Sequence, residues 1–247
     1  MHSKSKKVAA IAGATGGIGS SCARLFALNG FDLVIMGRNE QRLKDLEVEL
    51  SESSTNVISA TVDVRDLEAL MHIGQYVKQE HGKVDVLVNC AGGQFFQMAK
   101  DMNEHGWRAV LETNLFGAFY LAKSFFELLL ASHGSIVNVV ANIYDKPAMG
   151  LSHSSAARAG VVNLTKALAL EWARYGIRVN AVSPGVTLTD GLKAMTGANI
   201  QDLISRVPLG RAASADEIAR IIYFLASDAA AYITGAVVVA DGGLGLL

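Results

Sequence analysis

The residues that most clearly indicate chemistry form a glycine-rich segment near the N-terminus, Gly13-Ala14-Thr15-Gly16-Gly17-Ile18-Gly19. The segment follows an apolar run and opens a helical one. Glycines in a strand–turn–helix context let the backbone approach a pyrophosphate, and the N-terminal amide groups of the helix attract its negative charge. The residues expected to contact a dinucleotide here are Gly13, Thr15, Gly17, Ile18 and Gly19.

Arg38 bears on which dinucleotide binds. A dinucleotide with a free ribose 2′-hydroxyl usually meets a carboxylate at the end of the second strand. Here the run Ile35-Met36-Gly37-Arg38-Asn39 carries no acid before Glu40. A guanidinium can pair with a 2′-phosphate through planar, charge-assisted contacts. The sequence therefore favours NADPH over NADH, and the alternative is that Arg38 is a solvated surface arginine.

Alternating apolar runs and helical stretches must position these residues. The runs at 8–11, 32–36, 57–62, 84–88, 135–140, 178–182 and 236–239 are predicted strands. Most are uniformly apolar, which is typical of parallel strands covered on both faces. Helices are predicted at about 17–29, 40–51, 66–81, 106–131, 153–175 and 214–227, with Asp66 and Ser214 as N-caps. The alternation predicts an α/β fold in one domain over residues 1–247, a doubly wound parallel sheet of Rossmann type.

Composition narrows the classes of function. A net charge of −1 argues against nucleic acid or an anionic membrane as the main partner. No apolar run approaches the roughly 20 residues that span a bilayer, and no apolar leader precedes the first strand, so we expect a cytoplasmic protein. Cys22 and Cys90 are expected to be reduced, buried thiols, and no metal-ligand spacing is present.

Residues 188–211 break the strand–helix rhythm and are predicted to form a lid over the ligand crevice.

Further motifs, in order along nearly the whole chain, resemble the short-chain dehydrogenase/reductase superfamily. Besides the glycine segment they are Asn89-Cys90-Ala91-Gly92, Asn114-Leu115, Pro184-Gly185 and Asp241-Gly242-Gly243. The resemblance implies that Asp63 and Val64 contact the adenine. It also implies that Asn89, Ala91 and Gly92 steady the sheet and border the ribose. The residues implied at the nicotinamide end are Pro184, Gly185, Thr187 and Thr189.

The catalytic positions of that superfamily are where this chain departs from it. Standard members carry Tyr-x-x-x-Lys on the helix after the fifth strand, and a Ser about thirteen residues before the Tyr. The match places Ser154 at the Tyr position, Arg158 at the Lys position and Ala141 at the Ser position, whereas Asn114, the fourth family residue, is retained. A serine hydroxyl is too weakly acidic to protonate the alkoxide that carbonyl reduction creates, so an ordinary ketoreductase mechanism is not expected.

Reduction of an α,β-unsaturated thioester requires a less acidic proton donor than reduction of a ketone does. Hydride addition at the β-carbon places charge on the thioester oxygen as an enolate, which is far less basic than an alkoxide and is stabilised by oxyanion donors. The run from His153 to Gly160 resembles the peroxisomal trans-2-enoyl-CoA reductases and their 2,4-dienoyl-CoA relatives, although Val162 stands where the former have a Tyr. The resemblance implies an enoyl thioester substrate, on coenzyme A or a carrier protein.

Each candidate catalytic residue has a role in that interpretation. Arg158 would bind the nicotinamide ribose. Ser154, one helical turn away on the same face, would donate to the thioester carbonyl or merely make room for the acyl group. Asn114 would hold a water or the helix backbone. Tyr144 and His153 are candidate proton donors, or else a plain loop aromatic and a helix-end histidine.

Three other interpretations stay open. The chain would bind NADPH without catalysis, would run a non-redox reaction on the same fold, or would be a ketoreductase rebuilt around Tyr144 or His153. In the superfamily the helices matching 106–131 and 153–175 pair across a dimer interface and tetramers are common, which implies a homotetramer here.

Overall fold

The computed structural model describes residues 6–51, 55–196 and 200–246. The first five residues of the polar N-terminal segment and residues 197–199 of the expected lid lie outside the described residues.

The central element is a seven-stranded, wholly parallel sheet in the order β3-β2-β1-β4-β5-β6-β9. The strands are β1 (Val8–Ala12), β2 (Asp32–Gly37), β3 (Val57–Thr61), β4 (Val86–Asn89), β5 (Ser135–Val139), β6 (Arg178–Pro184) and β9 (Val237–Ala240). Every predicted strand is confirmed to within two residues at each end. The strand order reverses between β1 and β4, and in such sheets the ligand crevice lies outside the carboxyl ends of the strands at that point.

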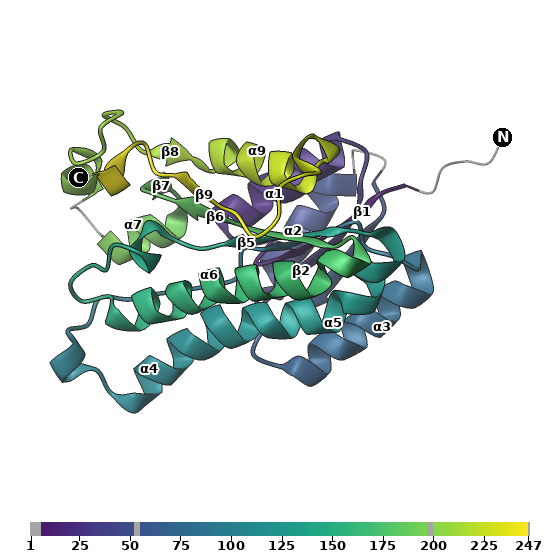
Figure 1. Ribbon diagram of the computed structural model, residues 1–247, viewed down its shortest axis with the longest axis horizontal. Coiled ribbons are helices and arrows are strands. Elements are labelled where there is room, and N and C mark those ends of the chain that lie inside the picture. The colour runs from purple at the N-terminus through teal and green to yellow at the C-terminus, as the bar shows by residue number, and fades with distance from the viewer. Residues whose placement is uncertain (1–5, 52–54, 197–199, 247) are drawn as a thin grey trace.

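Helices cover both faces of the sheet (Figure 1). One layer contains α1 (Gly17–Leu28), α2 (Glu40–Ser51) and α9 (Ala215–Ala226), whose buried side chains share one apolar cluster with Ile11, Ile35 and Val137. The other contains α3 (Leu67–His81), α5 (Gly117–Ser132) and α6 (Ser152–Trp172), which pack around a second cluster. The predicted doubly wound α/β fold is therefore confirmed.

The helix predicted at 106–131 is longer and less regular than the sequence indicated. It begins as α4 (Glu104–Leu111), widens into a π-helical segment, η2 (Glu112–Phe116), and continues as α5. By length and composition alone the stretch Glu104–Ser132 is long and apolar enough to cross a membrane, although polar residues interrupt it. The core helix of a soluble protein passes the same test. In the fold this helix packs against α3 and α6.

The predicted helix caps are confirmed. The Asp66 carboxylate accepts a hydrogen bond from the Ala69 amide at 3.0 Å, and Ser214 forms a reciprocal capping box with Glu217 at the start of α9. The region predicted as a lid contains two short helices, α7 (Asp190–Thr196) and α8 (Ile200–Ile204), between two short paired strands, β7 (Thr187–Leu188) and β8 (Ala213–Ser214). The remaining turns are η1 (Ala99–Asp101), η3 (Asn142–Tyr144), η4 (Ala173–Tyr175), η6 (Asp228–Ala230) and η7 (Leu244–Leu246).

Candidate functional site

Two adjoining cavities open at the carboxyl ends of β1 and β4. The first has a volume of about 340 Å³ and lies against β2 and β3, and the second has a volume of about 360 Å³ and lies against β5 and β6. Both are lined by Gly13, Gly16, Gly17, Cys90, Gly92 and Gly191. The glycine segment is thus the shared floor of one continuous crevice, where sequence reasoning placed the pyrophosphate.

Gly13 must be glycine for this floor to form. It has a left-handed φ of +74°, and a Cβ there would lie 2.7 Å from the Ala91 amide nitrogen. A side chain would therefore separate the end of β1 from the end of β4. The first α1 amides next to this turn have no side-chain cap, since Gly16 occupies the N-cap position. The cradle and the helix terminus together fit a diphosphate group.

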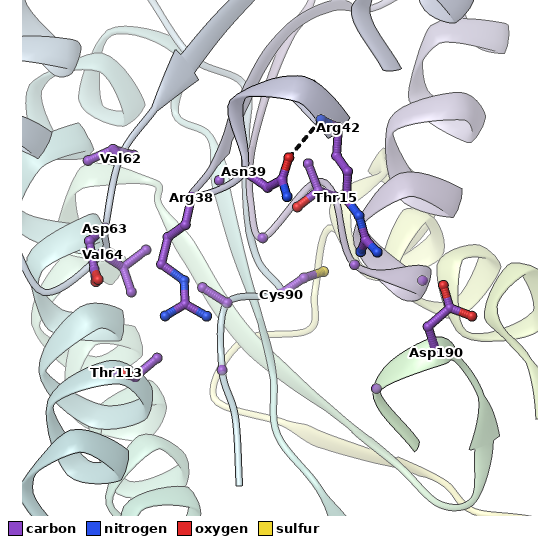
Figure 2. Close-up of a pocket in the computed structure, with 17 residues that line it drawn as sticks. Thr15, Arg38, Asn39, Arg42, Val62, Asp63, Val64, Cys90, Thr113 and Asp190 are labelled. Carbon is purple, nitrogen blue, oxygen red and sulfur yellow. Dashed lines mark hydrogen bonds between the residues drawn. The ribbon is translucent and has the colours of Figure 1, made fainter. Parts of the chain in front are cut away.

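Two arginines reach into the first cavity. Figure 2 shows Arg38 and Arg42 on either side of Asn39, with both guanidinium groups pointing into the cavity. Asn39 caps α2, because its Oδ1 accepts the Arg42 amide at 2.9 Å. Neither guanidinium forms a salt bridge with any residue that the structure describes. Arg42 was missed in the sequence, although it follows Arg38 at the spacing of one helical turn.

Asp63 and Val64 line the same cavity, as predicted. Arg65 binds the Asp63 carboxylate with two nitrogens, the closest contact being 2.7 Å from Nη2. Hydrogen bonding from Arg65 lowers the pKa of Asp63, against a smaller opposing effect of burial. The carboxylate is therefore charged and held in place by its neighbour.

Asn89 and Asn114 lie beside the crevice and hold its backbone. Asn89 is buried; its Oδ1 accepts the Ala91 amide at 3.1 Å and its amide donates to Asn138. Asn114 sits in the π-helical segment, where Nδ2 donates to the Gly93 and Val110 carbonyls at 2.9 and 2.7 Å. The Gly93 amide returns a bond to Asn114 Oδ1 at 3.3 Å. Both side chains steady the loop after β4.

Arg158 lines the second cavity. Its Nη1 donates to the Val139 carbonyl at 2.7 Å, and its buried Nε has no partner among the described residues. A Cβ on Gly92 would lie 2.5 Å from Arg158 Nη2, so only glycine lets the guanidinium rest there. Burial lowers the pKa of Arg158 to about 10, so the group stays charged at neutral pH. A guanidinium in this cavity fits the hydroxyl groups of a ribose.

Ser154 is fully buried and its hydroxyl donates to Gln94 Oε1 at 2.7 Å. Gln94 lines the second cavity, whereas Ser154 does not. The contact fixes the carboxamide so that its Nε2 end, with two N–H donors, faces away from Ser154. Ala141, which the resemblance matches to the family serine, lines the same cavity, and its side chain carries no donor. Gln94 is thus a site residue that sequence reasoning missed.

Tyr144 and His153 lie outside both cavities. Tyr144 packs against an apolar cluster that includes Val140 and Val161. His153 is fully buried with its ring centroid 4.6 Å from that of Phe95, and burial lowers its pKa. At neutral pH the imidazole is therefore uncharged, and neither side chain faces the cavity that Gln94 and Arg158 line.

The other predicted cofactor residues fall where expected in the crevice. Thr15 and Ala91 line the first cavity, and Ile18, Gly19, Pro184, Gly185, Thr187 and Thr189 line the second. Thr113 also lines the first cavity and was not predicted from the sequence. Asp190 and Leu192 line the crevice from within the segment 188–211, which was predicted as a lid without naming single positions.

The prediction of two buried thiols is half wrong. Cys22 is buried on α1, but Cys90 is partly exposed and lines both cavities. Cys90 follows the last residue of β4, so it lies where the sheet edge opens rather than inside the sheet. Within the described ranges no cluster of three metal-ligating side chains occurs.

Sequence comparison finds relatives along almost the full chain. The profile of a family described as Enoyl-(Acyl carrier protein) reductase matches residues 13–245. A 3-oxoacyl-acyl-carrier-protein reductase from Thermotoga maritima is 36% identical over 241 residues, which cover 96% of this chain and 97% of the relative. A probable 2,4-dienoyl-CoA reductase from Bacillus subtilis is 34% identical, with 96% of each chain covered.

Solved structures agree with this likeness. A single-residue variant of the actinorhodin polyketide ketoreductase, solved with NADPH, superposes with a TM-score of 0.94 at 32% identity, over 100% of both chains. A short chain dehydrogenase from Bacillus anthracis superposes with a TM-score of 0.89 at 36% identity, over 98% of this chain and 97% of the other.

Proposed function

Because the chain belongs to the short-chain dehydrogenase/reductase superfamily of nicotinamide-dependent oxidoreductases, we propose that it uses NADPH to reduce the α,β double bond of an enoyl thioester. The acyl group would be carried on coenzyme A or on a carrier protein.

The crevice supports a phosphorylated dinucleotide as cofactor. The glycine floor would hold its diphosphate, Arg158 its nicotinamide ribose, and Arg38 with Arg42 its 2′-phosphate. NADPH supplies a hydride when bound. Two guanidinium groups that form no salt bridge with a described residue are better matched to a phosphate than to a ribose hydroxyl, which favours NADPH over NADH.

The observation that carries the reaction type is the Ser154–Gln94 contact. At the position of the family tyrosine there is no phenol, and the serine hydroxyl is already donating to a carboxamide. Gln94 is a hydrogen-bond donor without an exchangeable acidic proton in the neutral range, so it can stabilise an oxyanion but cannot neutralise an alkoxide. An enolate needs only stabilisation at oxygen, and its α-carbon can take a proton from water. We assign Gln94 Nε2 as a donor to the thioester oxygen, with Ser154 as the residue that positions it.

Ketone reduction is the competing chemistry, since some relatives are 3-oxoacyl reductases. It requires an acid near the reacting oxygen, and the two candidates, Tyr144 and His153, line neither cavity. This disfavours a ketoreductase rebuilt around either residue.

The test is a direct comparison of substrates. Purified protein with NADPH would be mixed with a trans-2-enoyl-CoA or, in parallel, a 3-oxoacyl-CoA, while absorbance of the reduced nicotinamide is followed and products are identified by mass. We expect oxidation with the enoyl thioester and formation of the saturated thioester. Turnover of the 3-oxo substrate alone, or NADPH binding with no oxidation on either, would refute the proposal.

Assembly and the lid belong to the same proposal. Large apolar side chains remain exposed on the paired long helices, including Phe119 on α5 and Leu170 on α6. Such surface is what a subunit contact would cover, which supports a homotetramer built on these helices. Residues 188–211 would close over the crevice, since Thr189 already lies against Gly17.

A further inference from the structure

An apolar surface lies on the loop that contains Gln94 and on the segments next to it. Its members are Phe95, Phe96, Met98, Trp107 and Met149, exposed by 39, 52, 45, 37 and 82% respectively. They come from the loop after β4, from α4 and from the loop before α6, which meet at the end of the molecule where α4 begins (Figure 1). We call these five residues the entrance patch. Contiguous exposed side chains of this size mark a binding surface more often than a solvated one.

The patch is a built surface rather than a set of loose side chains. The Gln97 amide donates to the Gly150 carbonyl at 2.9 Å, which ties the two loops together. A Cβ on Gly150 would lie 3.5 Å from Phe96, and one on Gly106 would lie 3.0 Å from Phe95 Cζ. The rings of Phe95 and Phe96 therefore each pack against a glycine, and both remain partly exposed.

A depression of about 230 Å³ adjoins the patch at Trp107. The rest of its lining is Ala99, Met102, Asn103, Glu104 and Ser152, so it has both apolar and polar walls. Phe95 follows Gln94 directly in the chain, so the patch begins beside the assigned carbonyl site. A thioester held at Gln94 would therefore place its acyl chain next to the patch.

The charges near the depression are paired with one another. Glu104 binds Arg108 at 2.7 Å, and Lys100 lies 3.5 Å from the Asp101 carboxylate. These pairs are exposed and balance one another, so this part of the surface offers no net charge that would attract an ionic ligand. An uncharged hydrocarbon chain is compatible with such a surface.

We propose that the entrance patch binds the distal part of the acyl chain, so that the preferred substrate is a medium- or long-chain enoyl thioester rather than a short one. This inference rests on the proposed function, because it uses the thioester position at Gln94. Each methylene buried on the patch should raise kcat/KM by about fourfold until the patch is filled.

The kinetic test compares trans-2-dodecenoyl-CoA with crotonyl-CoA in the wild type and in surface variants. We expect the wild type to prefer the longer substrate by at least about tenfold in kcat/KM. Phe96→Ser and Met149→Ser should each lower that preference about fivefold, since each removes an apolar side chain from the patch. Leu28→Ser is the matched control, because Leu28 is equally apolar and 78% exposed but lies at the end of α1. It should leave the preference unchanged.

A binding measurement separates the inference from the reductase proposal. The chain has two tryptophans, so Trp172→Phe leaves Trp107 as the reporter. Saturated dodecanoyl-CoA, below its micelle concentration, should shift Trp107 emission to the blue, and butanoyl-CoA should not. A shift without reduction of any enoyl thioester would support the acyl site and overturn the reductase. Reduction of both chain lengths with equal kcat/KM and no shift would overturn the acyl site and leave the reductase standing. If Phe96→Ser changes the oligomer size and leaves the preference for acyl chain length unchanged, the patch is a subunit contact. That result would also overturn the acyl site.

Discussion

The two arginines of the first cavity give the sharpest prediction about the cofactor. Replacing Arg38 by Ala removes a guanidinium that reaches into the cavity and forms no salt bridge in the described part of the chain. A charge-assisted hydrogen bond contributes about 1.5–3 kcal/mol, and exposure to solvent brings the expected value to the lower end of that range. At about 1.5–2 kcal/mol, the Kd for NADPH rises roughly 10- to 30-fold. NADH has no 2′-phosphate, so its Kd should change less than about twofold.

Calorimetry or fluorescence titration of both cofactors with wild type, Arg38→Ala, Arg42→Ala and the double variant would measure this selectivity. Because both guanidinium groups would hold the same phosphate, the double variant should lose less than the sum of the single losses. The NADPH preference should also shrink as salt is raised, since exposed charges are screened. Arg24→Ala is the control, because Arg24 is an exposed arginine whose partner is Glu49.

Equal losses for NADPH and NADH in Arg38→Ala would refute the reasoning, because the side chain would then be supporting the cavity wall rather than reading a phosphate. A wild-type protein that binds NADH as tightly as NADPH would refute it more directly.

Four further predictions concern the reaction centre, the thiols, acid stability and assembly. Ser154→Ala should lower kcat on an enoyl thioester about fivefold, the effect of losing one hydrogen bond of ~1 kcal/mol, with KM for NADPH unchanged in steady-state kinetics. Iodoacetamide should alkylate Cys90, and NADPH should protect it. Cys22 should stay unmodified, because a hydrogen bond to Cys90 and, to a smaller extent, burial raise the pKa of its thiol. Peptide mass mapping distinguishes the two cysteines. Hydrogen bonding lowers the pKa of Glu217 from 4.5 to about 2. Its contribution to stability is therefore full above about pH 4.5 and is lost as pH falls toward 2. In acid denaturation, Glu217→Gln should flatten the dependence of the unfolding free energy on pH over that range. Leu170→Glu should reduce oligomer size in light scattering, and an unchanged mass would show that the exposed α6 face is not a subunit contact.

The sequence was sufficient where structure follows from local pattern. Uniformly apolar runs become buried parallel strands, as β1 and β5 do, because both faces of the sheet are covered by helices. The backbone conformation of the glycine segment is one that glycine adopts readily, so the residue types alone made the floor of the crevice predictable. Asn114 was predictable as a site residue through the resemblance, but the π-helical widening that turns its side chain toward Gly93 was not, since nothing in the pattern of α4 and α5 marks it.

The rest depends on contacts between distant segments. Ser154 and Gln94 are 60 residues apart, and only the fold of the loop after β4 brings them within 2.7 Å. Sequence reasoning therefore assigned the donor role to the serine on the helix and overlooked the residue that faces the cavity. Arg42 was overlooked for a different reason: a charged residue in an amphipathic surface helix has no local feature that separates cofactor contact from solvation.

The replacement of the family tyrosine that the resemblance implies has a chemical logic under the proposed function, once Gln94 is included. In a tyrosine-based centre one group must both polarise the oxygen and deliver a proton, so its pKa has to be lowered by a neighbouring cation. Here the cation is retained as Arg158, whose guanidinium lies against Gly92, but the group facing the cavity is a carboxamide that does not titrate. Such a centre can hold negative charge on oxygen without ever transferring a proton to it. Among the reactions that start with hydride addition to an acyl thioester, conjugate addition is the one whose product anion tolerates that restriction. This reasoning supports the proposed reduction of an activated carbon–carbon double bond over reduction of a ketone.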